Sequence, residues 1–170
     1  MITAPEPEPL LAVEGLEVSL GTPAVSAVRG VDFSMAAGEI LAVAGESGSG
    51  KSVTALALCR LLPQRAQPTI RGKVQWDGQP QNLLLLREKA LRSLRGNEIG
   101  YIFQEPSACF NPLFSIEAHF KEILGLQGVP RHAQPMAMEE ALLAVGIEPD
   151  RKNLRALPAE FSGGMLQRAA

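Results

Sequence analysis

One eight-residue segment constrains this chain more than any other feature. It reads Gly45-Glu46-Ser47-Gly48-Ser49-Gly50-Lys51-Ser52 and matches the pattern G-x-x-x-x-G-K-[ST]. Glycines at these positions let the backbone turn tightly and aim several N–H groups at one anionic point. Lys51 can reach the outer phosphates of a nucleotide, and the Ser52 hydroxyl can hold Mg²⁺. The segment therefore predicts a loop that wraps the phosphates of ATP or GTP.

The flanks of this segment agree with that interpretation. Residues 39–44 form a short, nearly continuous apolar run, which is typical of a buried parallel strand. After the motif, Ser52 to Leu62 contains no helix breaker, and Pro63 follows. The expected local structure is a strand, a phosphate loop and a helix.

Bulk composition indicates a globular chain of 170 residues, with 46% apolar and 20% charged residues. The formal net charge of −2 excludes a global field that would recruit nucleic acid, so no nucleic-acid partner is expected. Two cysteines without a pair spacing favour a reducing compartment over a disulfide framework. His119 and His132 are interpreted as ordinary surface or helix residues. Clustered cations are interpreted as the solvated face of an amphipathic helix: Arg87, Lys89, Arg92 and Arg95.

The remaining segments show two kinds of hydrophobic pattern, one typical of strands and one typical of helices. Alternating apolar and polar residues predict half-exposed antiparallel strands at 16–20, 31–35 and 73–76, and residues 99–103 suit a second buried parallel strand. Helical spacing predicts helices over 81–95, 116–124 and 138–145. The fold class is therefore α/β, a phosphate-loop nucleotide-binding core with an antiparallel β flap and a helical subdomain.

Two further segments narrow the kind of phosphate-loop protein. Residues 100–106 run from a predicted strand directly into Gln104 and a proline. In residues 161–168, Ser162 is a good N-cap, and Gly163 and Gly164 leave the next N–H groups unobstructed. Taken alone, each segment is a weak signal, because a Gln after a strand or a Ser-Gly-Gly turn is common.

In this order, the three segments resemble the ATP-binding subunit of an ABC transporter, from about Leu10 to Ala170. Residues 45–52 match its Walker A motif, Gln104 its Q-loop glutamine, and residues 161–167 its signature motif. The sequence of these motifs is similar to that of the ATP-binding subunits of importers of oligopeptides, dipeptides and nickel. That similarity lies in residues 45–56, 103–106, Asn111-Pro112 and 161–165.

The resemblance implies a role for each matching residue. Gly45 to Ser52 would cradle ATP, Ser52 and Gln104 would approach Mg²⁺, and Gln104 would position the attacking water. Ser162, Gly163 and Gly164 would touch the γ-phosphate of ATP held by the opposite subunit of a head-to-tail dimer. The implied partners are a second ATP-binding subunit, two membrane-spanning permease subunits and, indirectly, a solute-binding protein. The implied location is the cytoplasmic face of the inner membrane.

The resemblance also sets expectations about domain limits. Residues 1–9, rich in Pro and Glu, are expected to be a disordered lead-in, and 10–170 a partial ATP-binding domain. Core and flap are expected over about 10–104, and the helical subdomain over about 105–165. The family's Walker B acid and catalytic glutamate belong after the signature helix and have no match in these residues, so a domain truncated before Walker B and without its own ATP turnover is expected. Leu20 stands where relatives often stack an aromatic side chain on adenine.

Three alternatives stay open. The chain could be a catalytically silent nucleotide-binding fragment, or a soluble ABC-type ATPase of another class that acts in DNA repair or translation. A small phosphate-loop kinase is the third, although it would need a lid rich in arginines. Neither the solute nor the choice between a homodimer and a heterodimer of ATP-binding subunits follows from the sequence.

Overall fold

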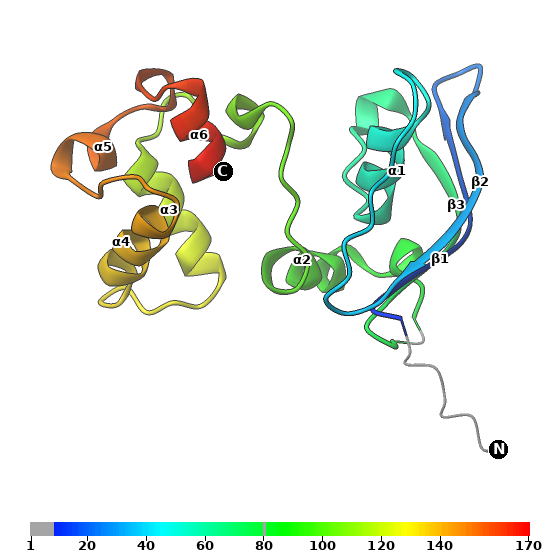
Figure 1. Cartoon of the computed structure of the whole chain (residues 1–170), viewed down its shortest axis with the longest axis horizontal. Coiled ribbons are helices and arrows are strands. Elements are labelled where there is room, and N and C mark those ends of the chain that lie inside the picture. The colour runs from blue at the N-terminus through cyan, green and yellow to red at the C-terminus, as the bar shows by residue number, and fades with distance from the viewer. Residues whose placement is uncertain (1–8, 80) are drawn as a thin grey trace. The chain divides into compact units, whose positions relative to one another are not determined.

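The computed structural model describes residues 9–79 and 81–170 (Figure 1). The chain divides into two compact units, residues 1–92 and residues 93–170, here called unit 1 and unit 2. The predicted disordered lead-in lies, up to residue 8, outside the described residues. The helix α2 (Glu88–Asn97) crosses the boundary between the units.

Unit 1 is built on a three-stranded antiparallel sheet in the order β2-β1-β3. Its strands are β1 (Leu11–Leu20), β2 (Val25–Met35) and β3 (Thr69–Trp76), so the predicted antiparallel flap is confirmed and its strands are longer than expected. Because β1 is central, it pairs along nearly its whole length with both neighbours.

A bulge in β1 decides which of its side chains face the core. The register shifts between Val13 and Leu16, and Gly15 there has a φ of 56°, which favours glycine. Because of this shift, Val13 before the bulge and Leu16 and Val18 after it are all buried, and each is at most 2% exposed. Asp32 stabilises the bulge, because its Oδ1 accepts a hydrogen bond from the Gly15 N–H at 2.6 Å.

The helix α1 (Lys51–Leu58) follows the phosphate loop and packs against β1 and β2 (Figure 1). It ends four residues before the predicted Leu62. The reason is a Schellman motif, in which the Leu61 N–H donates to Leu56 O at 2.8 Å and the Arg60 N–H to Ala57 O at 2.9 Å. Arg60 takes the left-handed position with a φ of 51°.

Two predicted parallel strands are wrong. Residues 39–44 and 99–103 are irregular, and Ile40 and Ile102 are 95% and 75% exposed. A buried parallel strand takes its hydrogen bonds from neighbouring strands and its cover from helices. In the described part of the chain the sheet contains β1, β2 and β3 alone, so neither segment has a strand to pair with.

The predicted helix over 81–95 is also two elements rather than one. A 3-10 turn (Leu83–Leu85) is capped by Asn82, whose side chain accepts from the Leu84 N–H, and α2 begins at Glu88. Leu91 and Leu94 are buried while Arg92 is exposed, which confirms the amphipathic interpretation of this segment.

Unit 2 is mainly helical, as predicted. Its helices are α3 (Ile116–Leu126), α4 (Gln134–Ala144), α5 (Arg151–Arg155) and α6 (Gly163–Ala169). Their apolar faces meet in a core of six buried side chains: Ile116, Met138, Leu142, Ile147, Phe161 and Leu166. Of the helices described here, none has the length and apolar character needed to cross a membrane.

Candidate functional site

The phosphate loop, Gly45 to Ser52, lies in unit 1 between the irregular segment 39–44 and α1. All three of its glycines adopt positive φ, 156° at Gly45, 82° at Gly48 and 92° at Gly50. Other residues rarely adopt these angles, so the glycines are what allow this curvature. Ser49 closes a turn within the loop, since its N–H donates to Glu46 O at 3.2 Å.

Lys51 folds back over the loop. Its Nζ donates to Gly45 O at 2.8 Å and to Glu46 O at 2.6 Å, and lies 3.4 Å from the Ser49 Oγ. These contacts hold the ammonium group at the mouth of the loop. A phosphate group there would replace these neutral carbonyl acceptors, so no ion pair of Lys51 would have to break on binding.

The N-terminus of α1 has no side-chain cap, a feature it shares with α4, whose N-cap is Ala133. The N-cap of α1 is Gly50, which offers no side-chain hydrogen bond to the first turn. By contrast, Ser115, Asp150 and Ser162 each cap their helix with a side-chain oxygen. The first N–H groups of α1 therefore keep their capacity to bind an anion, and the helix dipole adds favourable potential.

Gly50 also brings the loop close to the sheet. A Cβ at this position would lie 2.5 Å from Ala27 O of β2, a distance that no side chain tolerates. A Cβ on Gly45 would lie 2.8 Å from the Ser49 Oγ. Among the glycines of the loop, the close approach to the sheet is therefore specific to Gly50, since a Cβ on Gly45 would first meet the Ser49 side chain and one on Gly48 nothing within 4 Å.

A cavity of about 380 Å³ lies beside the loop. Its walls are β2 residues 26–29 and Val31, together with Gly48, Ser49 and Thr54. At the adjoining hairpin, Leu20 pairs with Val25, which is 67% exposed. Ala27, Val28 and Val31 contribute the apolar part of the lining of this cavity.

Gln104 and the Ser162 cap both belong to unit 2. Gln104 is exposed and precedes a 3-10 turn (Pro106–Cys109). The Ser162 Oγ accepts from the Met165 N–H at 3.2 Å, so Ser162 is the N-cap of α6 as the sequence predicted. Gly163 and Gly164 are exposed, and a Cβ on either would meet nothing within 4 Å.

Unit 2 also links these two motifs. Gln167 of α6 donates from Nε2 to Phe103 O, the carbonyl just before Gln104, at 3.4 Å. The turn Pro106–Cys109 packs on α6 as well. The structure therefore brings the glutamine segment and the signature helix into contact within one unit.

His119, expected to be an ordinary surface or helix residue, is a buried residue of α3 with two main-chain partners. It is 7% exposed, and both ring nitrogens contact the main chain, Nε2 the Asn111 N–H and Nδ1 the Ser115 carbonyl, each at 2.9 Å. A signal was present in the sequence, since His119 stands four residues after the N-cap Ser115 and so on the same side of the first helical turn.

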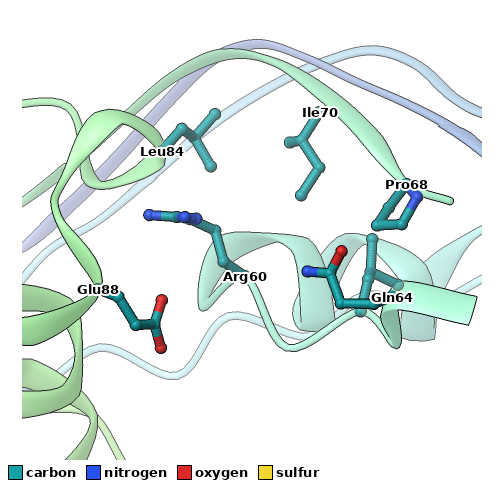
Figure 2. Close-up of a pocket in the computed structure, with 7 residues that line it drawn as sticks. Arg60, Gln64, Pro68, Ile70, Leu84 and Glu88 are labelled. Atoms are coloured by element: carbon teal, nitrogen blue, oxygen red, sulfur yellow. The ribbon is translucent and has the colours of Figure 1, made fainter.

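A second cavity, of about 360 Å³, lies elsewhere in unit 1 (Figure 2). Arg60, Leu62, Gln64, Pro68, Ile70, Leu84 and Glu88 line it. The Arg60 Nη1 donates to Leu86 O at 2.6 Å, which ties the end of α1 to the segment before α2. None of its lining residues belongs to the phosphate loop. The Arg60 side chain in its wall has a structural role, because it forms the hydrogen bond to Leu86 O.

The phosphate loop has the groups that a nucleotide with a divalent cation needs, namely backbone N–H groups, the Lys51 ammonium group and the Ser52 hydroxyl. Ser52 supplies a hydroxyl at the start of α1, and the remaining ligands of such a cation would be phosphate oxygens and water. Over residues 9–79 and 81–170, no group of three His, Cys, Asp or Glu side chains could hold a metal ion by itself.

Comparison with known proteins places these features in context. The family model described as ABC transporter matches residues 28–170. The peptidoglycan transport ATP-binding protein YejF of Agrobacterium fabrum is 45% identical over 95% of this chain and 30% of its own length. The oligopeptide transport ATP-binding protein OppD of Bacillus subtilis is 40% identical over 94% of this chain and 45% of its own length. The chain thus spans less than half the length of these two relatives.

Solved structures show the same fold at lower identity. A dimeric structure of MJ0796, a bacterial ABC transporter cassette, has a TM-score of 0.75 at 22% identity, and covers 94% of this chain and 66% of the other. The structure of cbiO1 from Clostridium perfringens, part of the transporter complex cbiONQ, has a TM-score of 0.70 at 23% identity, and covers 95% of this chain and 59% of the other. The α/β nucleotide-binding fold that the sequence predicts is therefore confirmed.

Proposed function

Because this chain belongs to the ABC transporter family, we propose that it is the phosphate-binding and coupling part of an importer's ATP-binding subunit, and that the importer moves peptides or a related solute. Family membership implies nucleotide binding. Relatives named for peptidoglycan and oligopeptide transport support the choice of solute class. The proposed location is the cytoplasmic face of the cell membrane, beside two permease subunits.

One observation carries the proposal. The Lys51 ammonium group lies on the carbonyls of Gly45 and Glu46, at the N-terminus of a helix that no side chain caps. In this arrangement, Lys51 would turn from the carbonyls to the outer phosphates of ATP. The backbone N–H groups of the loop would surround the inner phosphates, and the Ser52 hydroxyl would hold the cation. When bound, Mg²⁺ would neutralise part of the phosphate charge.

The roles proposed for unit 2 depend on a second subunit. Ser162 uses its oxygen to cap α6, and its hydroxyl proton stays able to donate to a γ-phosphate. Gly163 and Gly164 would offer unobstructed N–H groups to the same phosphate. Gln104 would reach the metal and the attacking water. In a head-to-tail dimer these groups would complete the ATP site of the partner.

Nucleotide titration tests the loop. Lys51→Ala should weaken binding of a fluorescent ATP analogue about tenfold to a hundredfold, the range expected for a hydrogen bond to a charged group. Lys121→Ala is the matched control, since its ammonium group pairs with Glu117 on the surface of α3. Equal affinity of the Lys51→Ala variant and the wild-type protein would contradict nucleotide binding by this loop.

Isolation from cells tests the transporter role. The protein should co-purify with two membrane-spanning subunits, and deletion of its gene should abolish growth on a peptide as sole source of a required amino acid. Recovery with ribosomes or DNA-repair proteins instead would favour the soluble ATPase class.

A further inference from the structure

We propose that His119 is a positioning residue for Gln104, a role that rests on the proposed function. In its neutral Nδ1–H form, His119 docks the turn at Asn111 onto α3, and so anchors one end of the segment that carries Gln104.

The hydrogen-bond partners of His119 fix its tautomer. The Asn111 N–H is a donor, so Nε2 at 2.9 Å must present its lone pair. The Ser115 carbonyl is an acceptor, so Nδ1 at 2.9 Å must carry the proton. Both contacts are satisfied together by the neutral ring with its proton on Nδ1 and by no other form.

The turn next to His119 has its own internal bonds. Asn111 O accepts from the Phe114 N–H at 3.1 Å, and Asn111 Oδ1 accepts from the Leu113 N–H at 3.0 Å. The turn can therefore form without the histidine. What His119 adds is its attachment to α3, because the bond to Asn111 joins the start of the turn to the first turn of the helix.

Aromatic packing supports the same attachment. The rings of Phe110 and His119 meet edge to face with centroids 5.1 Å apart, and the tilted ring of Phe114 has its centroid 6.0 Å from that of His119. Phe110 itself packs against the core of unit 2. The imidazole is thus fixed by its neighbours as well as by its two hydrogen bonds.

The segment that carries Gln104 is bonded at both ends to helices of unit 2. At one end, Gln167 of α6 donates to Phe103 O, and at the other, His119 of α3 accepts from Asn111. Gln104 lies between these anchors and is exposed. Ser162 is the N-cap of α6, so the helix that carries the signature motif also contacts the backbone next to Gln104.

The tautomer can be measured directly. Long-range ¹H–¹⁵N correlation spectra of the wild-type protein should show His119 with a protonated Nδ1 and an unprotonated Nε2. His132, which is exposed, serves as the internal reference. A protonated Nε2 on neutral His119 would overturn the proposal.

Two substitutions test the attachment. His119→Leu removes both bonds, while His119→Gln keeps an acceptor and a donor on one side chain. Amide exchange at Asn111 should become about tenfold faster in the Leu variant and stay within about threefold in the Gln variant. Exchange in α4 should be the same in all three proteins. Equal exchange at Asn111 in the Leu variant and the wild-type protein, or a Gln variant as fast as Leu, would overturn the attachment. If the Leu variant does not fold, the Gln variant must still fold and protect Asn111.

The kinetics of ATP hydrolysis by the native transport complex distinguish a positioning role of His119 from a role in nucleotide binding. His119→Leu should lower kcat for ATP about tenfold with KM changed less than about twofold, because the phosphate loop lies in unit 1. His119→Gln should restore most of kcat. An unchanged kcat in the Leu variant would contradict the positioning role while nucleotide binding stands. Loss of the proposed function would instead appear as an unchanged affinity in Lys51→Ala, with the tautomer and exchange results unaffected.

Discussion

Lys51 and Gly50 show how single residues prepare the loop for an anion. The lysine ammonium group is held by main-chain carbonyls rather than by a carboxylate, so an incoming phosphate replaces neutral acceptors and no ion pair must break. Gly50 contributes by what it lacks, since the absence of a side chain lets the loop approach Ala27 of β2.

A pair of glycine substitutions separates curvature from close approach. Gly50→Ala should destabilise unit 1 more than Gly48→Ala, because a Cβ at Gly50 would lie 2.5 Å from Ala27 O, whereas at Gly48 it would meet nothing within 4 Å. The left-handed backbone costs each alanine about 1–2 kcal/mol, so the excess at Gly50 measures the clash. Urea unfolding gives the two free energies. Equal losses would contradict the close approach.

At the scale of elements, the contrast lies in how the helices begin. Three of them start at a side chain that caps the first turn, and these starts are recognisable in the sequence as Ser115, Asp150 and Ser162. The start of α1 has glycine at this place and keeps its N–H groups available. The start of α4 at Ala133 is also uncapped, so what sets the start of α1 apart is the glycine at its N-cap, at a φ of 92°, together with the Lys51 ammonium group beside it.

Removal of a cap tests the helix that carries the signature motif. Ser162→Ala should cost about 1 kcal/mol of stability, because the Met165 N–H loses its acceptor. Asp150→Ala, which removes the cap of α5, should cost a similar amount. Ser162→Thr should retain most of the stability. Thermal unfolding at a series of urea concentrations measures these differences in the free energy of unfolding. If Ser162→Ala were as stable as the wild-type protein, the cap would contribute nothing.

At the scale of the whole molecule, the most unusual feature is an exposed apolar segment. Ile40 is 95% exposed, Val43 is 56% exposed, and residues 39–44 pair with no strand among the described residues. Apolar surface of this kind promotes association.

Association of the purified chain should therefore depend on this segment. Ile40→Glu with Val43→Glu should lower the self-association seen by sedimentation velocity over a concentration series. Leu85→Glu is the control, because Leu85 is 81% exposed but lies in the 3-10 turn Leu83–Leu85. If the control reduced association equally, general solubility rather than this segment would be the cause.

Purified by itself, outside the native transport complex, the polypeptide of residues 1–170 should bind ATP without sustained turnover. Phosphate-loop ATPases place carboxylates on the cation and the attacking water, and residues 1–170 contain no Asp-Glu pair after an apolar run. A coupled phosphate-release assay measures turnover. Steady release that Lys51→Ala abolishes would contradict this expectation.

Local chemistry is the part of this protein that its sequence determined by itself. The phosphate loop and the helix starts at Ser115, Asp150 and Ser162 each depend on neighbours within a few residues, through hydrogen bonds and φ preferences that the residue types reveal. Alternation also predicted the strands, although β1 pairs with the distant β3, as in Leu11 with Trp76. The roles of the loop residues, Gln104 and Ser162 to Gly164 stay predictions.

Tertiary structure decided what depends on distant partners. Residues 39–44 have the composition of a buried strand, yet strand formation needs neighbours that composition cannot supply. The bulge at Gly15 has a distant partner in Asp32 of β2, whose Oδ1 accepts from the Gly15 N–H. His119 has its role because the fold brings the Asn111 turn to the first turn of α3, where both ring nitrogens find main-chain partners.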